Sequence, residues 1–209
     1  MKNHSDELIF HSQGLRRSAA NLGIASEKSP SRISPRGLSA MRFDIKETMV
    51  KAVINNEVLL SYPEGFEEMD REALKEAFLD DNPNRWGIKD EKRHMLVTVL
   101  WNRTNMITAM ITGPGTIADS VEHKMKTSLN KSRYKFGGFE RKKISGRNAN
   151  GFTYEYVLEG VDQIGEVLVF QNVNCYYTLY TYALKENRQA ARVVIDAIES
   201  SIQFTNDKK

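Results

Sequence analysis

The chain has 209 residues, of which 40% are hydrophobic and 27% are charged, and its net charge is +3. This composition is typical of a globular protein and excludes fully disordered and membrane compositions. The single cysteine, Cys175, excludes an internal disulfide. No apolar run reaches the roughly 20 residues that a membrane-spanning helix needs. The run Leu8-Ile9-Phe10 is too short for a signal peptide, so we expect a cytoplasmic protein.

Residues 1–45 differ from the rest of the chain and predict a flexible, mildly basic tail. Serine, proline, glycine and arginine are frequent there and no apolar period is sustained. Such a segment cannot offset the entropy cost of ordering, so a solvated tail is the favoured interpretation. Contact with nucleic acid or an acidic surface is one alternative, and a true start at Met41 or Met49 is another. Residues 46–205 are predicted to form one domain.

The first half of this domain predicts a hairpin, a short helix and a second strand pair. Two apolar runs flank Asn55-Asn56, a pair that tolerates the positive φ angles of a tight turn. Asp70 is a good helix N-cap, and the apolar helical stripe behind it closes by Pro83. The expected elements are strands 50–54 and 58–62, a helix between 70 and 83, and strands 86–88 and 95–101.

The second half predicts a helix, a four-strand meander and a closing helix. Gly113-Pro114-Gly115 interrupts regular structure, and Thr116 with Asp119 resembles a capping box. The turns between the strands are too short for parallel crossovers. The expected elements are a helix from 116 to about 131, strands 139–144, 152–158, 164–170 and 175–184, and a helix capped by Asn187 with Ala190, Val194, Ala197, Ile198 and Ser201 inward.

This order of elements predicts an α+β fold. Residues 152–158 alternate strictly between two faces, which is typical of an antiparallel sheet with one face better buried. Helices with a single apolar stripe must pack on such a sheet. The expected architecture is a three-layer α/β/α sandwich with a mainly antiparallel, twisted sheet of about seven strands and three helices packed on it.

Two segments resemble the PsbP-like sandwich family. A strand that ends in Pro63-Glu64-Gly65-Phe66 and leads into a short capped helix is similar to the opening of that fold. The segment Tyr176 to Tyr180, followed by a helix that ends in Ile198 to Phe204, is similar to its close. The family includes the photosystem II extrinsic subunit, a Ran-binding nuclear import factor and bacterial DcrB-related proteins. The resemblance implies a non-enzymatic scaffold that binds a partner, and it places no partner-contacting residue in this chain.

Residues that carry catalysis or bind metals form no recognisable motif. The four histidines (His4, His11, His94 and His123) are far apart, and no Cys-x-x-Cys or Asp-rich loop is present. Cys175 lies in a predicted aromatic strand, which favours a buried, inert thiol over a nucleophile. Gly113 to Thr116 favours a plain turn and helix cap over an anion cradle, because a P-loop lysine is missing. We expect no enzyme, no cofactor and no metal.

Charge is distributed in two opposite blocks. Nine acids and two bases lie between Glu57 and Asp81, and nine bases and one acid lie between Lys124 and Arg147. Three interpretations stay open: solvated surface, steering of a protein partner or a second copy, and binding of a polyanion with aromatic stacking. The candidate partner-binding residues from these blocks are Lys124, Lys126, Lys131, Arg133, Lys135, Arg141, Lys142, Lys143, Glu64, Glu67 and Glu68.

Tyrosines in the predicted strands supply a further candidate surface. Tyr154, Tyr156 and Tyr180 share an aromatic sheet face that either lines a groove or packs under helices, and packing is the commoner outcome. The leading hypothesis is a protein-binding or adaptor module, with nucleic-acid binding through residues 124–147 as the alternative and homo-oligomers also considered. An enzyme is the least favoured.

Overall fold

The computed structural model describes residues 48–78, 80–129, 133–158 and 160–207. The predicted tail 1–45 lies outside the described residues. Ten strands form two sheets, and four α-helices are present in the described ranges. The elements are β1 (Met49–Ile54), β2 (Val58–Pro63), β3 (Glu67–Glu68), α2 (Arg71–Phe78), β4 (Arg85–Asp90), β5 (Met95–Arg103), α3 (Met106–Ile111), α4 (Pro114–Ser128), β6 (Tyr134–Ile144), β7 (Arg147–Leu158), β8 (Val161–Asn172), β9 (Cys175–Leu184), α5 (Arg188–Ser201) and β10 (Gln203–Phe204), with single 3₁₀ turns at Lys185–Asn187 and Thr205–Asp207.

A seven-stranded sheet forms the middle layer, in the order β3-β4-β5-β9-β8-β7-β6. Every neighbouring pair is antiparallel, as the short connections require. A second, three-stranded sheet has the order β1-β2-β10. The fold is therefore a mixed α+β sandwich built on a seven-stranded antiparallel sheet, which confirms the class predicted from the sequence.

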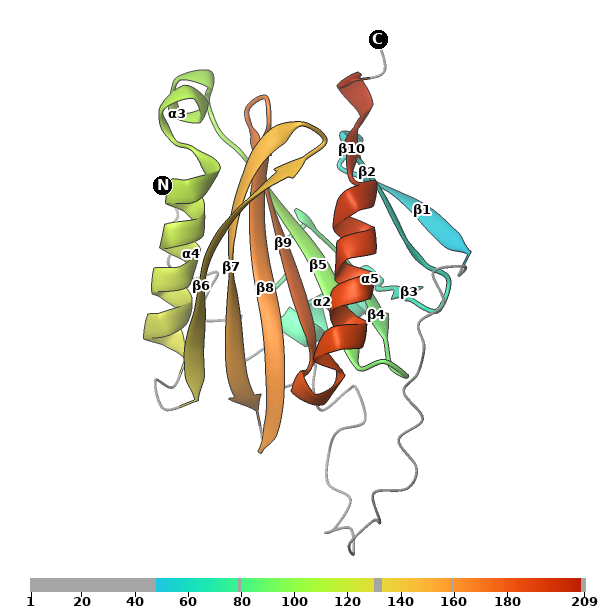
Figure 1. The fold of residues 1–209 in the computed structure, drawn as a ribbon. Coiled ribbons are helices and arrows are strands. Elements are labelled where there is room, and N and C mark those ends of the chain that lie inside the picture. The colour runs from blue at the N-terminus through green and yellow to red at the C-terminus, as the bar shows by residue number, and fades with distance from the viewer. Residues whose placement is uncertain (1–47, 79, 130–132, 159, 208–209) are drawn as a thin grey trace, which may run out of the picture.

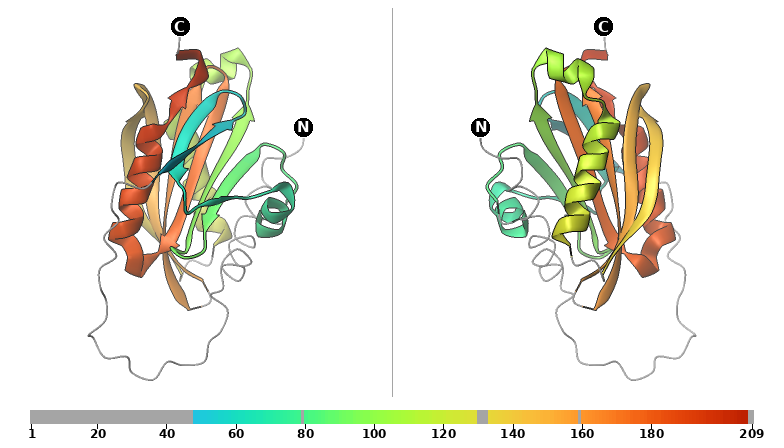
Figure 2. Two further views of the ribbon diagram at one scale, coloured as in Figure 1. Left: turned by 90° about the vertical axis from the view of Figure 1, so that its right-hand side faces the viewer. Right: turned by 90° about the vertical axis from the view of Figure 1, so that its left-hand side faces the viewer.

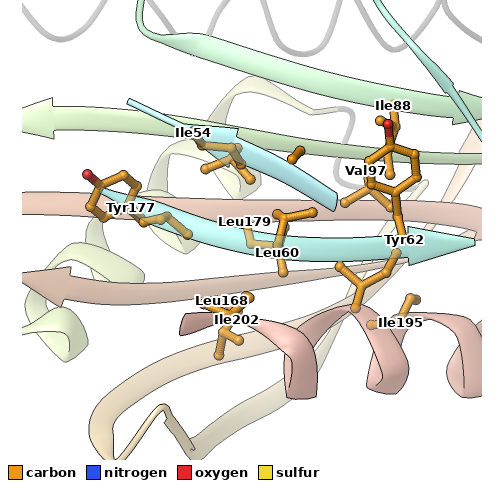
Figure 3. Close-up of a cluster of buried hydrophobic side chains, with 14 of the residues drawn as sticks. Ile54, Leu60, Tyr62, Ile88, Val97, Leu168, Tyr177, Leu179, Ile195 and Ile202 are labelled. Carbon is orange, nitrogen blue, oxygen red and sulfur yellow. The ribbon is translucent and has the colours of Figure 1, made fainter. Parts of the chain in front are cut away.

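The two faces of the large sheet have different covers (Figures 1 and 2). Helices α2 and α4 pack on one face, over an aromatic cluster from β7 and β9. Helix α5 and the small sheet pack on the other face. In the close-up of this second core, Leu60 of β2 lies beside Leu179 of the large sheet, and Ile195 of α5 belongs to the same cluster (Figure 3). One outer layer is thus part sheet and part helix.

The β1–β2 hairpin follows from its sequence. Asn55 and Asn56 hold φ angles of 50° and 56°, left-handed values that suit the tight connection of residues 55–57 between Ile54 and Val58. The backbone N–H of Ala73 donates to Asp70 Oδ1 at 2.8 Å, which makes Asp70 the cap of α2 as predicted.

Three local predictions about the helices are corrected. Helix α4 begins at Pro114, with Gly113 as its N-cap and no capping side chain, so Thr116 and Asp119 form no capping box. A proline at the first helical position sacrifices no hydrogen bond, and this fixes the start. Asn187 makes no side-chain cap for α5. The inward side of α5 is confirmed at Val194 and Ile198, but Ala197 is exposed, and Ala190 and Ser201 are half-buried. The buried residues are Ala191, Val194, Ile195, Ile198 and Glu199.

None of the helices in the described ranges is long and apolar enough to cross a membrane. The sequence analysis also missed helix α3, a six-residue helix between β5 and α4. Its sequence, MITAMI, is apolar except for Thr108, and six residues are too few for a helical period to be recognised.

Candidate interaction surface at the free edge of the sheet

Strand β6 is the open edge of the large sheet (Figure 2). Among the described strands it pairs with β7 alone, and of its eleven residues only Ile144 is buried. The opposite edge is β3, which has two residues. A long edge strand presents a row of unpaired backbone groups, and natural proteins protect such edges with lysines, bulges or covering segments.

Local sequence sets the shape of β6. Ser145 and Gly146 form a two-residue turn to β7 with φ angles of 48° and 77°, which fixes the register. A bulge at Gly137 shifts this register between Phe136 and Gly138. A side chain at Gly137 would place its Cβ 2.3 Å from Thr153 Oγ1, so only glycine fits there.

The register determines which backbone groups of β6 are free. Ile144 pairs with Arg147 across the two-residue turn, and such flanking residues exchange both hydrogen bonds. The pattern alternates along an antiparallel ladder, so Lys142 and Glu140 also bond to β7. The N–H and C=O groups of Arg141 and Lys143 therefore point away from the sheet, toward solvent.

A cleft of about 730 Å³ lies beside this edge, between α5 and the β6–β8 half of the sheet. We name it the α5 cleft. Its walls combine apolar groups with both signs of charge. The lining residues are Lys135, Phe136, Gly137, Glu140, Thr153, Tyr154, Glu155, Ile164, Gly165, Glu166, Arg188, Gln189, Arg192, Val193 and Ile195.

A buried ion cluster joins β6, β8 and α5 at the side of this cleft. Lys142 Nζ donates to Glu199 Oε2 at 3.0 Å and also to Glu166. Arg192 bonds to Glu166 and lies 3.4 Å from Glu199 Oε2. Glu166 and Glu199 are only 3% and 5% exposed. Two cations thus hold two buried carboxylates, and Glu199 Oε1 has no hydrogen-bond partner among the described residues.

Burial perturbs the acid–base chemistry of this cluster. Desolvation, followed by the charge of Glu166, raises the pKa of Glu199 to about 7. Burial alone would lower the pKa of Lys142, but the hydrogen bond to Glu166 and the charge of Glu199 raise it above its ordinary value. The cluster therefore links β6, β8 and α5 through a charged lysine, and Glu199 is its pH-sensitive member.

A second ion group closes the other end of the cleft. Glu155 accepts from Lys185 at 2.8 Å and from Arg188, and Lys135 lies 4.0 Å away. These hydrogen bonds lower the pKa of Glu155. Lys135 itself is exposed at 77% of its side chain, so it stays available to an incoming group.

The predicted basic residues fall into three groups. Arg133, Lys135, Arg141 and Lys143 are exposed along β6 or just before it. Lys126 is exposed on α4 and Lys124 is half-buried there. Lys142 faces inward to the ion cluster, and Lys131 lies outside the described residues. Strand register explains this difference, which residue type alone did not predict. Lys142 lies on the opposite face of β6 from Arg141 and Lys143, so it is half-buried while they are exposed.

The predicted acidic residues lie at the opposite edge of the large sheet. Glu67 and Glu68 are β3 itself, and Glu64 is exposed just before it. Glu68 Oε1 accepts a hydrogen bond from Trp86 Nε1 at 2.8 Å. The two edges of one sheet thus carry opposite charges, which the linear sequence indicated only as separate blocks.

The predicted tyrosines are core residues. Tyr154, Tyr156 and Tyr180 are buried between the large sheet and helix α4. The ring of Tyr154 lies over Gly165 on the neighbouring strand, where a Cβ would approach its Cζ to 2.4 Å. Of the two interpretations of this aromatic face, packing under helices therefore describes these tyrosines, and an open groove does not. The exposed aromatic residues are instead Phe136 and Phe139 on β6.

Groups capable of catalysis are dispersed in the described residues. Cys175 is buried, and desolvation raises the pKa of its thiol. His123 is exposed on α4, and His94 is in the turn between β4 and β5. No group of three or more metal-ligating side chains comes together in these ranges.

Comparison with solved structures places the fold. Cyanobacterial PsbP from Synechocystis superposes with a TM-score of 0.55 at 14% identity, over 82% of this chain and 99% of that one. The Ran-binding protein Mog1p of Saccharomyces cerevisiae gives a TM-score of 0.49 at 7% identity, over 75% and 95%. LpqN of Mycobacterium tuberculosis, which is involved in cell envelope biogenesis, gives 0.41 at 11%, over 71% and 83%. A scan of family models and a search of curated proteins found no match. The chain has a PsbP-like fold.

Proposed function

We propose that this PsbP-like chain is a non-enzymatic protein-binding module that takes an extended, acidic segment of a partner protein along β6. The observation that carries the proposal is a long, exposed and basic edge strand whose outward backbone groups have no ladder partner among the described strands. An added strand would satisfy those groups, as in other proteins that bind peptides by strand addition.

The surroundings of β6 supply the specificity that strand addition needs. Side chains of an added strand alternate between the two faces of the sheet. Those on one face would enter the α5 cleft, where Ile164 and Val193 offer apolar contact. Lys135, Arg141 and Lys143 would attract acidic side chains, because opposite charge raises the rate and selectivity of encounter.

A selection experiment tests this proposal with an unbiased library of peptides. Peptides displayed on phage are selected on the immobilised full chain, and we expect enriched sequences that alternate apolar and acidic residues. Arg141→Pro removes an outward N–H that would donate to the added strand, so it should weaken the binding of the selected peptides at least tenfold. The variant should still fold, because an edge strand tolerates proline where the N–H faces solvent. Peptides that bind Arg141→Pro as tightly as the wild type would contradict strand addition.

The polyanion alternative predicts a different result. A single-stranded DNA oligonucleotide would contact cations and the exposed rings of Phe136 and Phe139, and its affinity would fall steeply with salt. It would not depend on a backbone N–H, so Arg141→Pro and Arg141→Gln should weaken it equally. Strand addition predicts a larger loss for the proline variant.

The proposal also covers the location of the protein and its self-association. From the sequence we expect the protein to be in the cytoplasm. Oppositely charged edges favour head-to-tail contact between copies, but β3 offers only two residues to pair with β6. We therefore assign the edge to a partner segment, and sedimentation equilibrium of the free chain should report a monomer.

A further inference from the structure

Helix α3 holds four large apolar side chains in solvent. Met106, Ile107, Met110 and Ile111 are 57, 72, 83 and 79% exposed, and only Ala109 of this helix is buried. Figure 1 shows α3 at one end of the molecule, above the start of α4. Single exposed apolar residues are ordinary, but a contiguous group of this size marks an interaction site.

The helix is held firmly in this exposed position. Asn105 Oδ1 accepts from the N–H of Thr108 at 2.7 Å and caps the first turn. Gln171 Nε2, on β8, donates to the carbonyl of Ala109 at 3.1 Å. The hydroxyl of Tyr176, on β9, donates to the carbonyl of Thr112. The large sheet therefore positions α3, and its apolar side chains are presented by a fixed scaffold.

Val173 extends the same apolar group from the β8–β9 turn. It is 58% exposed, and its carbonyl accepts from the Gln171 amide that also holds Ala109. Its φ angle is 53°, a left-handed value that is unfavourable for a β-branched residue. Asparagine or glycine would suit this turn better. An exposed side chain kept at a strained position is the mark of a functional constraint.

Unpaired positive charge lies at the same end. Arg141 and Lys143 are exposed and make no ion pair with another described residue. They share the α4 side of β6, since Arg141 pairs across the ladder with Asn150. A Cβ on Gly115, in the first turn of α4, would lie 3.7 Å from the Asn150 side chain. The apolar group thus has basic side chains on its flank.

We propose that this apolar tip, which consists of Met106, Ile107, Met110, Ile111 and Val173, inserts into the surface of an anionic lipid bilayer. The inserted aliphatic side chains would supply hydrophobic contact, while Arg141 and Lys143 would attract the headgroups. None of the five tip residues lines the α5 cleft or belongs to β6, so the proposal goes beyond the binding of an extended segment, although Arg141 and Lys143 would serve both surfaces.

The composition and size of the tip favour lipid over protein. A stable protein interface buries roughly 800 Å² on each partner, more than five partly exposed side chains on one short helix and one turn present. The centres of protein interfaces are also rich in tryptophan, tyrosine and arginine, and the tip contains only methionine, isoleucine and valine. A bilayer needs no complementary groove.

Vesicle sedimentation with the full chain tests the proposal. We expect binding to vesicles of phosphatidylcholine with about one-third phosphatidylglycerol, and weaker binding to phosphatidylcholine alone. The tip variant Ile107→Gln, Met110→Gln, Ile111→Gln should bind at least tenfold more weakly. Val53→Thr removes an exposed apolar residue from β1, on the other side of the large sheet, and should bind as the wild type does. Circular dichroism verifies that both variants fold.

Two further variants separate the contribution of the basic side chains from that of Val173. Arg141→Gln with Lys143→Gln should weaken binding to anionic vesicles about fivefold per charge, with little effect on neutral ones. Val173→Asn should raise the melting temperature by relieving strain and should lower vesicle affinity.

Three results would overturn the proposal. The first is that the wild type fails to sediment with anionic vesicles. The second is that the tip variant sediments as well as the wild type. The third is that the wild type is a dimer and the tip variant a monomer, which would assign the tip to a contact between copies. Peptide binding at β6 should survive in the tip variant, so failure here is distinguishable from failure of the proposed function.

Discussion

Strands β9 and β6 belong to one sheet and are built in opposite ways. All ten residues of β9 are buried, because it lies between two neighbours and beneath cover on both faces. Only one of the eleven residues of β6 is buried. Packing determines every position of β9, whereas β6 is held by its ladder with β7, its turn and the inward side chains of Lys142 and Ile144. Most side chains of β6 are therefore free to vary without loss of packing.

The largest expected effect is in β9. Tyr177 is fully buried, stacks on Phe170 with ring centroids 5.5 Å apart, and donates to Glu57 Oε2 at 2.8 Å. Tyr177→Ala should lower the free energy of unfolding by about 3–5 kcal/mol, because it leaves a cavity and removes one of the hydrogen bonds to Glu57, which keeps those from Arg103 and Asn172. Phe139→Ala on β6 should cost less than about 1 kcal/mol. Urea denaturation measures both, and equal losses would contradict the contrast between these strands.

A matched pair of prolines tests β6 by itself. Glu140→Pro removes a hydrogen bond to β7 and should destabilise the chain by about 3 kcal/mol. Arg141→Pro, one residue along, removes only an outward N–H and should cost less than about 1 kcal/mol. Thermal denaturation compares the two. A larger loss for Arg141→Pro would mean that the register assigned to this edge is wrong.

The ion cluster should make stability depend on pH. The pKa of Glu199 is about 7 in the folded chain and about 4.5 when unfolded, so the folded state binds more protons between these values. The stability of the wild type therefore falls as pH rises from about 4.5 through 7. Glu199→Gln does not titrate, and its stability relative to the wild type should rise by on the order of 1–3 kcal/mol between pH 5 and 8.

Glu140→Gln serves as the control for this pH effect. Glu140 is more exposed than Glu199 and lies 3.6 Å from the same Lys142 ammonium. Its replacement should leave the pH profile of unfolding unchanged. A flat difference for Glu199→Gln, or an equal slope for both variants, would contradict the assignment of Glu199 as the titrating group.

The smallest effect is expected at the other edge of the sheet. Glu67→Gln with Glu68→Gln removes the charge of β3, which is too short to accept an added strand. Peptides selected on the wild type should bind this variant within about twofold, as isothermal titration would measure. A large loss would show that the acidic edge also takes part in recognition.

Much of the fold was readable from sequence. The alternating face of residues 152–158, the Asn55-Asn56 turn and the short connections all express local rules, and each was confirmed. The predicted inward side of α5 was right at Val194 and Ile198 and wrong at Ala197, because the packing against β2 and β9, and not the periodicity alone, selects the buried residues. Helix α3 was missed because a hexapeptide that is apolar except for Thr108 is too short to show a helical period.

The candidate site was less predictable for a physical reason. Residue type identified a basic block, but only strand register separates Arg141 and Lys143, which face outward, from Lys142, which is tied to Glu166 and Glu199. The cleft also depends on where α5 packs on the sheet. One sequence feature could have indicated the inward face of β6. Glu140 is the single acid among nine bases, and it lies on the same face of the strand as Lys142.

Amide hydrogen exchange along β6 tests the central claim most directly. In the free chain, the N–H groups of Arg141 and Lys143 should exchange rapidly, while those of Glu140 and Lys142 are protected by β7. A bound peptide selected on the wild type should slow exchange at Arg141 and Lys143 at least tenfold, because its backbone accepts their hydrogen bonds. Unchanged exchange at both amides in the saturated complex would contradict strand addition at this edge.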